Sequence, residues 1–543
     1  MSHQTENLTF DEEVDVVVVG TGAAGLTAAL AAGANGAKVA LIEKQPTVGG
    51  TSAVSGGLAW IPAHKLVPGA DYSKEDARKY MQAQSVGSIA PEFIDVYVET
   101  GSKVLKFIES QSSLRFEAAV GFPDYRPELP GGKPEGGRSI GPLAYEATPI
   151  GEWGKHITEF PLDFSNVGFD SETKARLGKS AASSTGEVFV AGKALIAGLL
   201  EGLLKLGIEP RTETKALELI EADGHILGLR ISHDGKESTI GTKRGVILAN
   251  GGFEWDPELV TAFLRGPMRA PVSPPHGTGD ALRMQMGVGA ALGNMGEAWW
   301  VPSMQIPGDT IDGKQRSRSV RLERTRPGSI IVNRFGKRFM NEAGNYSSMG
   351  GPFHYLDPEK DYANDPAYMV FDKRHLDKYG SLGINPGDPV PEWFNESSSL
   401  AELAEKIGVD AEGLESTVKA WNKNVADLVD PDFHRGASAY DGYWGDQSAE
   451  TTAGKTLGPV DQGPFYAVEM ILGCLGTKGG GKTDTDARVF HIKGGHIDGL
   501  YAVGNAMASS MGKTYPGAGA TLGPCLVWGF RAGYHAATGK SFS

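Results

Sequence analysis

Three glycines near the N-terminus have the spacing of a loop that holds the pyrophosphate of a dinucleotide. They are Gly20, Gly22 and Gly25, in the pattern Gly-x-Gly-x-x-Gly. The acidic residue Glu43 follows 18 residues after Gly25, where a carboxylate can accept hydrogen bonds from an adenosine ribose. These residue types and spacings indicate a bound adenine dinucleotide and, through it, the chemistry of oxidation and reduction.

The elements that must position these residues surround them in the sequence. Residues 15–19 form a β-branched run that predicts a buried strand, residues 26–34 are rich in Ala and Leu and predict a helix, and residues 39–42 predict a second strand. Together they form a βαβ unit of about 30 residues, the context that makes the glycine pattern specific. The helix N-terminus would direct free N–H groups and a positive dipole at phosphate.

The composition of the 543 residues narrows the class of protein. Hydrophobic residues make up 40% and charged residues 22%, as in globular proteins, and the length allows two to four domains of about 100–200 residues each. The net charge of −14 argues against a nucleic-acid partner. The 75 glycines indicate many tight turns and close approaches of the backbone to a ligand.

The cysteine content and the charge near the N-terminus indicate in which cellular compartment the protein is expected. Cys474 and Cys525 are the two cysteines of the chain, which excludes a disulfide scaffold and a cysteine-rich metal site, and we expect both to be reduced. Asp484 and Asp486 lack further carboxylates at calcium-loop spacing, so no metal is expected. Acidic residues near the start and the lack of a long apolar run argue against a signal peptide and a membrane span. The expected location is cytoplasmic.

Further along the chain, the pattern predicts more strands and helices but no second dinucleotide loop. The expected helices are 71–108, 191–206 and 520–537, the expected strands are 216–231, 245–248, 487–490 and 499–504, and residues 122–142 are expected to form a loop rich in Gly and Pro.

Three segments resemble the flavoprotein superfamily that includes the flavoprotein subunits of succinate dehydrogenase and fumarate reductase. They are residues 43–57, 245–253 and 499–505. The resemblance implies an α/β fold in which both ends of the chain build one Rossmann-like FAD-binding domain, with an inserted α+β substrate domain. The implied division assigns residues 1–302 and 471–543 to the FAD-binding domain and residues 303–470 to the substrate domain.

The same resemblance implies FAD as the cofactor and assigns the residues that bind it. They are Gly20, Gly22, Ala23, Ala24, Gly25, Glu43, Lys44, Gly50, Thr51, Ser52, Ser55, Gly56, Gly57, Ala249, Gly251, Gly504, Asn505, Thr521 and Leu522. Succinate dehydrogenase-type proteins link FAD through a histidine, but residues 49–57 contain none here, so the implied attachment is non-covalent. Residues 512–523 also lack the arginine that the dicarboxylate enzymes carry, which argues against a dicarboxylate substrate.

At the substrate end, residues 514–519 (Thr-Tyr-Pro-Gly-Ala-Gly) resemble the 3-ketosteroid dehydrogenases, most of all the Δ1 type. The same group is matched by residues 55–62, 122–132, 476–480 and 483–488, and more loosely by residues 332–342. The resemblance implies removal of a proton from C2 and a hydride from C1 of a 3-ketosteroid, with the flavin N5 as hydride acceptor.

The resemblance also assigns the catalytic groups. The hydroxyl of Tyr515 and the backbone N–H of Gly519 would polarise the C3 carbonyl, as in an oxyanion hole. Tyr346 would take the C2 proton, and Tyr125 would stabilise the tyrosinate by hydrogen bonding, because a free tyrosine has a pKa near 10. From the residues alone, Tyr346 could instead be a surface residue. Two other tyrosines, Tyr97 and Tyr145, remain alternatives to Tyr125.

Other features allow more than one interpretation. Residues 314–326 carry six basic side chains and are expected to be a solvated arm or a subunit contact; attraction to lipid is possible, but membrane association is not predicted. Trp299 and Trp300 either line the substrate cleft or pack the junction between domains. The electron acceptor would be external and is not specified. Alternative functions are Δ4-(5α)-dehydrogenation of a 3-ketosteroid, reduction of an enone or unsaturated acid, and flavin binding by a regulatory protein without turnover.

Overall fold

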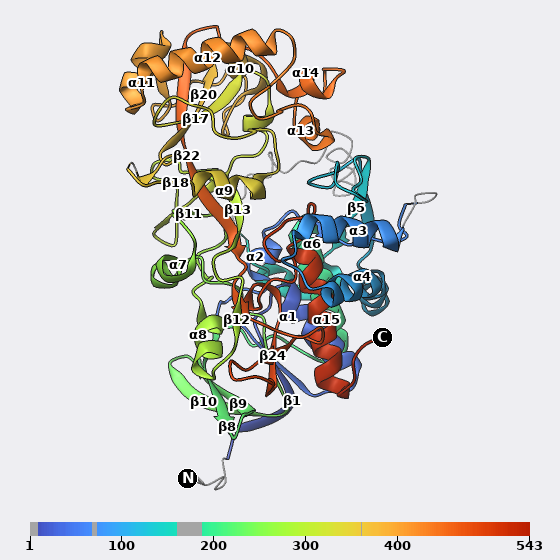
Figure 1. The fold of residues 1–543 in the computed structure, drawn as a ribbon. Helices are drawn as coiled ribbons and strands as arrows, with labels where there is room; N and C mark the ends of the chain where they lie inside the picture. The colour runs from blue at the N-terminus through green and yellow to red at the C-terminus, as the bar shows by residue number, and fades with distance from the viewer. Residues whose placement is uncertain (1–8, 68–72, 160–186, 360) are drawn as a thin grey trace.

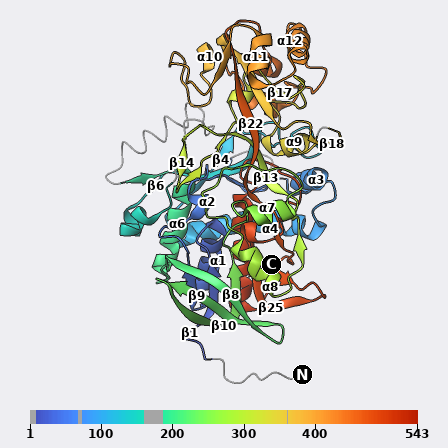
Figure 2. The ribbon, with the colours of Figure 1, turned by 90° about the vertical axis from the view of Figure 1, so that its left-hand side faces the viewer.

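The computed structural model describes residues 9–67, 73–159, 187–359 and 361–543 of the chain (Figure 1). One sheet lies in the lower half of that view beside the C-terminal helix, and a second sheet lies in the upper half with a group of helices over it. The long strand β22 (Phe465–Thr477) runs from the upper half into the lower half. Figure 2 shows the same elongated arrangement from the side.

The lower sheet joins the two ends of the chain. Its strands β1 (Glu12–Val19), β2 (Val39–Ile42), β10 (Lys236–Leu248) and β25 (His496–Ala502) are parallel and lie in the order β2-β1-β10-β25. Residues 16–19 of β1 are at most 4% exposed, as expected for a parallel strand that is covered on both faces. The α/β fold and the Rossmann-like domain built from both chain ends are therefore confirmed.

Two further strands widen this sheet beyond β25. They are β9 (His225–His233) and β8 (Thr214–Ala222), which pair with each other in antiparallel fashion. The strand signal at 216–231 is thus a hairpin, and its turn residues Asp223 and Gly224 have φ of 52° and 82°. Positive φ at both central residues is the geometry of a two-residue hairpin turn.

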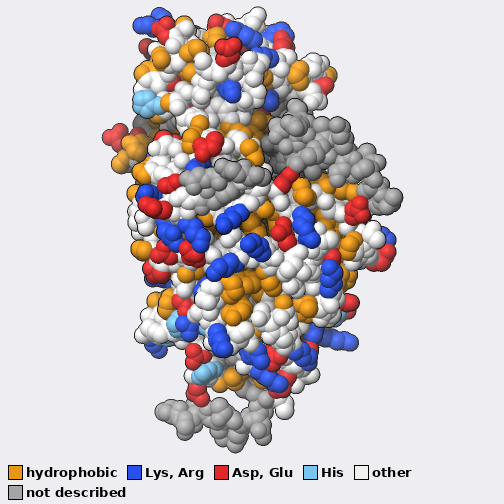
Figure 3. Space-filling view, turned by 90° about the vertical axis from the view of Figure 1, so that its right-hand side faces the viewer, with side chains coloured by type: hydrophobic (Ala, Val, Ile, Leu, Met, Phe, Trp, Pro, Cys, Tyr) orange, Lys and Arg blue, Asp and Glu red, His pale blue; other side chains and the backbone are white. Residues whose placement is uncertain are grey.

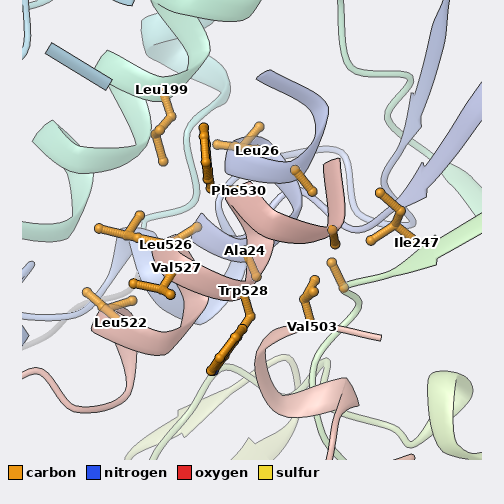
Figure 4. Packing of buried hydrophobic residues seen from close by; sticks show 14 of the residues in the cluster. Ala24, Leu26, Leu199, Ile247, Val503, Leu522, Leu526, Val527, Trp528 and Phe530 are labelled. Atoms are coloured by element: carbon orange, nitrogen blue, oxygen red, sulfur yellow. The ribbon is translucent and has the colours of Figure 1, made fainter. Parts of the chain in front are cut away.

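Helix α1 (Ala23–Ala34) follows β1 and packs against the C-terminal helix α15 (Leu522–Thr538). The two helices approach so closely that a Cβ atom on Gly529 would lie 2.5 Å from the carbonyl oxygen of Ala24. Figure 4 shows the buried cluster around this contact, which includes Leu26, Leu199, Ile247, Val503, Leu526 and Trp528. This packing holds the N-terminus of α1, and with it the glycine loop, against the C-terminal segment.

The upper sheet is built around β22. The first half of β22 pairs with β20 (Ala367–Asp372), which pairs with β17 (Ser329–Asn333), and the second half pairs with β13 (Ala298–Met304), all antiparallel. Helices α10 (Lys373–Tyr379), α11 (Leu400–Ile407) and α12 (Ala411–Val425) lie at this end of the molecule (Figure 1). The expected domain boundaries at 302 and 470 fall inside β13 and β22, and the division of the chain into domains stays a prediction.

The other helices of the described residues are α2 (Gly50–Ala53), α3 (Lys74–Ser85), α4 (Pro91–Gln111), α6 (Ala191–Lys205), α7 (Pro257–Phe263), α8 (Asp280–Gly287), α9 (Gly350–Phe353), α13 (Ala439–Tyr443) and α14 (Thr452–Thr456). Among the shorter strands are β3 (Ala59–Trp60), β4 (Phe116–Val120), β5 (Gly136–Pro142), β16 (Arg318–Ser319) and β24 (Arg488–Phe490). The helices predicted at 191–206 and 520–537 are confirmed as α6 and α15.

Two local predictions differ from the structure. The helix expected over 71–108 is two helices, since Val86 has a left-handed φ of 48° after α3 and Pro91 begins α4, where its missing N–H costs nothing. Residues 71 and 72 lie outside the described residues. The loop expected over 122–142 ends in strand β5, which pairs with β3 and β4.

The surface in Figure 3 carries Lys and Arg side chains interspersed with Asp and Glu. Between α3 and α4, for example, Arg78 forms ion pairs with Asp95 and Glu99. Such exposed pairs contribute little to stability. In the part of the chain that the structure describes, no helix is long and apolar enough to cross a membrane, and no cluster of His, Cys, Asp and Glu could hold a metal ion.

Candidate active site

One cavity of about 830 Å³ brings together nearly all the residues predicted to bind or react. It is lined by the glycine loop and the segment after Glu43, by the region around Tyr346, and by residues 504–522. Every predicted catalytic and cofactor-binding residue except Gly25 lines it. A Cβ atom on Gly25 would lie 1.9 Å from the carbonyl oxygen of Gly20, so Gly25 serves the close packing of α1 instead.

One end of the cavity offers the groups that a dinucleotide needs. Glu43 Oε2 accepts hydrogen bonds from the backbone N–H (3.0 Å) and the hydroxyl (2.7 Å) of Thr21, which hold the carboxylate beside the glycine loop. Ser52 Oγ accepts a hydrogen bond from the N–H of Ala23 at 3.1 Å, at the N-terminus of α1. Asn250 Oδ1 is buried at this cavity without a partner among the described residues. Because a buried polar atom needs a partner, Asn250 fits a ligand that donates hydrogen bonds, as FAD can.

The strand ends and a second helix complete this end of the cavity. Residues 249–251 follow β10 and residues 504–505 follow β25, at the carboxyl ends of parallel strands, where α/β sheets bind ligands. Thr521 and Leu522 lie at the start of α15. Lys44 is tied to Asp280 by an ion pair of 2.8 Å. Asn250 was not predicted to bind the cofactor, although it lies between Ala249 and Gly251, which were.

Three tyrosines from distant parts of the chain meet at the other end of the cavity. The hydroxyl of Tyr125 donates a hydrogen bond of 2.7 Å to the oxygen of Tyr346. The ring of Tyr515 lies 5.0 Å from that of Tyr125 and 5.5 Å from that of Tyr346, between centroids. Each of the three is at most 5% exposed, so Tyr346 is not a surface residue. Burial raises the pKa of Tyr125 and Tyr515 well above the usual value, so both carry their protons at neutral pH.

The two alternatives to Tyr125 lie elsewhere. The hydroxyl of Tyr97 donates to the carbonyl of Trp60, and that of Tyr145 donates to Glu201 at 3.0 Å. Neither tyrosine lines the cavity. The proximity of Tyr125 to Tyr346 therefore singles it out among the three.

The loop that carries Tyr515 is held through its backbone carbonyls. Side chains from elsewhere in the chain donate to four of them: Lys478 to Thr514 (2.7 Å), Gln84 to Tyr515 (3.0 Å), Tyr80 to Pro516 (2.6 Å) and Ser139 to Ala518 (2.7 Å). Because each carbonyl is anchored separately, the loop presents Tyr515 in one position. Sequence reasoning missed these anchors, since they act on backbone atoms and have no motif.

Gly519 ends this loop in a conformation that only glycine adopts easily. Its φ is 90°, and a Cβ atom there would lie 2.4 Å from the carbonyl carbon and oxygen of Leu58. The residue lines the cavity, and within the described ranges its N–H donates no hydrogen bond to the protein. A free backbone donor beside Tyr515 is the arrangement expected of an oxyanion hole.

Aromatic side chains that the sequence did not single out surround the tyrosines. The ring of Tyr440 lies 4.9 Å from that of Tyr125, and three others line the cavity: Phe122, Tyr443 and Trp444. The two tryptophans left open by the sequence have different positions. Trp299 packs behind Tyr515, with ring centroids 4.9 Å apart. Trp300 instead packs against His354, in a separate hydrophobic cluster.

The expectation of a solvated arm at residues 314–326 is wrong. Arg316 is 7% exposed and Arg324 is 1% exposed, and three arginines of this segment line the cavity: Arg316, Arg318 and Arg321. Asp309 forms ion pairs with both Arg316 (3.7 Å) and Arg318 (3.0 Å), measured between nitrogen and oxygen atoms. Local charge density suggested solvation, but ion pairing and backbone carbonyls allow these cations to be buried.

Comparisons with known proteins agree with this geometry. The family described as "FAD binding domain" matches residues 15–522. The 4-oxocyclohexanecarboxylate 2-dehydrogenase of Sinomonas cyclohexanicum is 40% identical, over 96% of this chain and 92% of its own length. The 3-oxosteroid 1-dehydrogenase of Mycobacterium tuberculosis is 37% identical, over 97% of this chain and 98% of its own length.

A solved structure extends the likeness to three dimensions. The 3-ketosteroid Δ1-dehydrogenase of Sterolibacterium denitrificans, in complex with 1,4-androstadiene-3,17-dione, superposes with a TM-score of 0.88 at 32% identity. The match covers 97% of this chain and 100% of that one. FAD is accordingly the cofactor of this protein. The chain belongs to the FAD-binding flavoprotein family and, within it, to the 3-ketosteroid Δ1-dehydrogenase family.

Proposed function

We propose that this protein is an FAD-dependent oxidoreductase that dehydrogenates the C1–C2 bond of a 3-ketosteroid. The observation that carries the proposal is the hydrogen bond of 2.7 Å between Tyr125 and Tyr346, with the ring of Tyr515 beside both, in the cavity that also contains the glycine loop. The relatives named above, at 37% and 32% identity over nearly the whole chain, support the same reaction.

Tyr515 and Gly519 act on the carbonyl. The hydroxyl of Tyr515 is a buried donor that keeps its proton, and the N–H of Gly519 lacks an acceptor in the described protein. Two such donors on the C3 oxygen stabilise the negative charge that develops there as the C2 proton leaves. Because the loop is anchored through its carbonyls, the donors need no rearrangement during the reaction.

Tyr346 takes the proton from C2. An anion on its oxygen accepts the hydrogen bond from Tyr125, and the guanidinium of Arg321 lies 5.4 Å from the centroid of its ring. Tyr125 therefore acts through Tyr346 and not on the substrate itself.

The electron pair of the C1–H bond leaves as a hydride while the C1–C2 double bond forms. Bound FAD supplies the acceptor for that hydride. Thr21, Glu43, Ser52 and Asn250 would hold FAD, and the attachment would be non-covalent. An external electron acceptor would then restore the oxidised cofactor.

The test is anaerobic. Purified holoenzyme is mixed with androst-4-ene-3,17-dione, and the visible flavin band is recorded. We expect the band to bleach and the product to carry a new 1,2 double bond by mass spectrometry and NMR. A product unsaturated at another position, or a flavin that no ring ketone reduces, would contradict the proposal.

A second candidate substrate is 4-oxocyclohexanecarboxylate. The relative that acts on it is 40% identical to this chain, and the arginines 316, 318 and 321 at the cavity suit an acidic substrate better than a neutral steroid. The bond that becomes double is equivalent, because in both molecules it joins the α and β carbons of a six-membered ring ketone. The same anaerobic assay with this keto acid distinguishes the two.

A further inference from the structure

Arg321 lines the cavity and forms no ion pair with the residues that the structure describes. Its Nε is buried and has no hydrogen-bond partner in that part of the chain. Its backbone N–H, by contrast, is hydrogen-bonded to Glu323 Oε2 at 3.2 Å. Arg316 and Arg318, which lie in the same segment as Arg321, both form ion pairs with Asp309.

The acid nearest to Arg321 in the chain does not neutralise it. Glu323 also lines the cavity and is 6% exposed, and burial raises the pKa of its carboxyl. In the described structure that carboxyl forms no ion pair with the guanidinium of Arg321 and accepts the backbone N–H of Arg321 instead. The guanidinium of Arg321 is therefore held at the cavity ready for an anion from outside the protein.

The position of Arg321 relative to the tyrosines defines where that anion must sit. Its guanidinium carbon lies 5.4 Å from the ring centroid of Tyr346, and the ring of Tyr346 lies 5.5 Å from that of Tyr515. A cyclohexanone with a carboxylate opposite the ketone spans about 6 Å on standard bond lengths. A ketone oxygen at Tyr515 and a carboxylate on the same ring at Arg321 are thus compatible with one small substrate.

We propose that Arg321 binds a carboxylate carried on the same six-membered ring as the reacting ketone, so that this site selects cyclic keto acids over neutral ring ketones. The proposal rests on the second candidate substrate of the proposed function: it keeps the same position for the ketone, and it favours the keto acid over the 3-ketosteroid. Guanidinium and carboxylate form charge-assisted, often bidentate hydrogen bonds. A neutral ligand would bury the same cation without a partner, which costs binding energy. Selectivity therefore comes from attraction of the acid and from rejection of its neutral analogue.

The experiment compares 4-oxocyclohexanecarboxylate with its methyl ester and with androst-4-ene-3,17-dione, by the rate of anaerobic flavin reduction. We expect the wild type to prefer the acid over the ester by about 30-fold in kcat/KM, the size of a charge-assisted hydrogen bond. Arg321→Gln should remove most of that preference through a higher KM for the acid, while any change in kcat should be equal for acid and ester because Arg321 also lies beside Tyr346, and Arg321→Lys should retain part of the preference. Arg326→Gln is the matched control. Arg326 carries the same charge as Arg321 and lies in the same segment, but it contacts Tyr379 and does not line the cavity.

Titration calorimetry with cyclohexanecarboxylate and its amide reads the anion site without turnover, because neither compound has a ketone to oxidise. We expect the acid to bind the wild type and Arg326→Gln but not Arg321→Gln, and the amide to bind none of them. Equal rates for acid and ester, or binding of the acid that survives Arg321→Gln, would overturn the proposal. A third outcome separates the two proposals. If no ketone reduces the flavin but the acid still binds in a way that requires Arg321, the proposed function is contradicted and the anion site is supported.

Discussion

Tyr125 and Tyr346 are 221 residues apart in the sequence, yet their hydroxyl oxygens are 2.7 Å apart. The hydrogen bond is buried, and Tyr125 is the donor. Tyr125 comes from the segment before β5, whereas Tyr346 comes from the region between β17 and β20. The proposed base and its stabilising partner are therefore supplied by separate parts of the chain, and both must be folded before the base can form.

Removing the hydroxyl of Tyr346 should abolish the base and leave the cavity intact. For Tyr346→Phe we expect the rate of flavin reduction by the ketone to fall by about 10²–10⁴-fold, the contribution of a positioned acid or base. FAD content, read from the ratio of visible to ultraviolet absorbance, should not change. Tyr534→Phe is a control on α15 outside the cavity. A Tyr346→Phe enzyme with wild-type turnover would remove Tyr346 from the mechanism.

Tyr515→Phe should remove one of the two donors to the carbonyl. We expect turnover to fall by about 10²–10³-fold, as when an oxyanion-hole donor is lost. The ring contacts with Tyr125 and Trp299 would remain, so FAD content should change far less than the rate. Stopped-flow reduction of the flavin and a count of bound FAD on the same sample give both numbers. Parallel loss of FAD and rate would point to a structural role for the hydroxyl.

Gly519→Ala should damage the loop itself. The new Cβ would lie 2.4 Å from the carbonyl group of Leu58, and φ of 90° is strained for alanine. We expect the free energy of unfolding to fall by about 3 kcal/mol, together with a loss of turnover. Gly351→Ala is the matched control, because a Cβ there meets nothing within 4 Å. Equal stability of the two variants in urea titrations would contradict this account of the loop.

Lys478 should make stability depend on pH. Burial lowers its pKa to about 7, and its ammonium lies 4.0 Å from the ring of Trp299 and donates to the carbonyl of Thr514. The unfolded chain, with an ordinary lysine pKa near 10.4, binds more protons between these two values. Lys478 therefore makes the free energy of unfolding rise with pH above about 7, by roughly 1.4 kcal/mol per pH unit.

Urea titrations at several pH values from 7.5 to 9.5 test this. The Lys478→Met variant should lack the rise that the wild type shows, while Lys419→Met, an exposed lysine on α12, should retain it. Parallel curves for wild type and Lys478→Met would mean that Lys478 titrates at its ordinary pKa. The variant also loses the donor to Thr514, so a slower flavin reduction at pH 9 would report on the position of Tyr515.

Features that depend on a short stretch of chain could be predicted from the sequence. The glycine loop, its flanking strands and Glu43 lie within about 30 residues, and the structure places them together because backbone geometry over that length follows from residue type. The tyrosines are different, since no local pattern links residues 125, 346 and 515. Their assignment came from a resemblance, and the fold brings their rings within 5.5 Å of one another.

The environment of the arginines could not be predicted from the sequence. Residues 314–326 by themselves indicate a solvated, basic segment, and the burial of Arg316 and Arg324 and the exposure of Arg321 to the cavity depend on partners elsewhere, such as Asp309 and the carbonyl of Gly344. The sequence alone determined the cofactor class and the βαβ unit at the N-terminus, because both rest on local periodicity and spacing. Only the tertiary structure decided which charges are paired, which cations line the cavity, and which tyrosines touch, because burial and pairing are set by residues that the chain brings together from a distance.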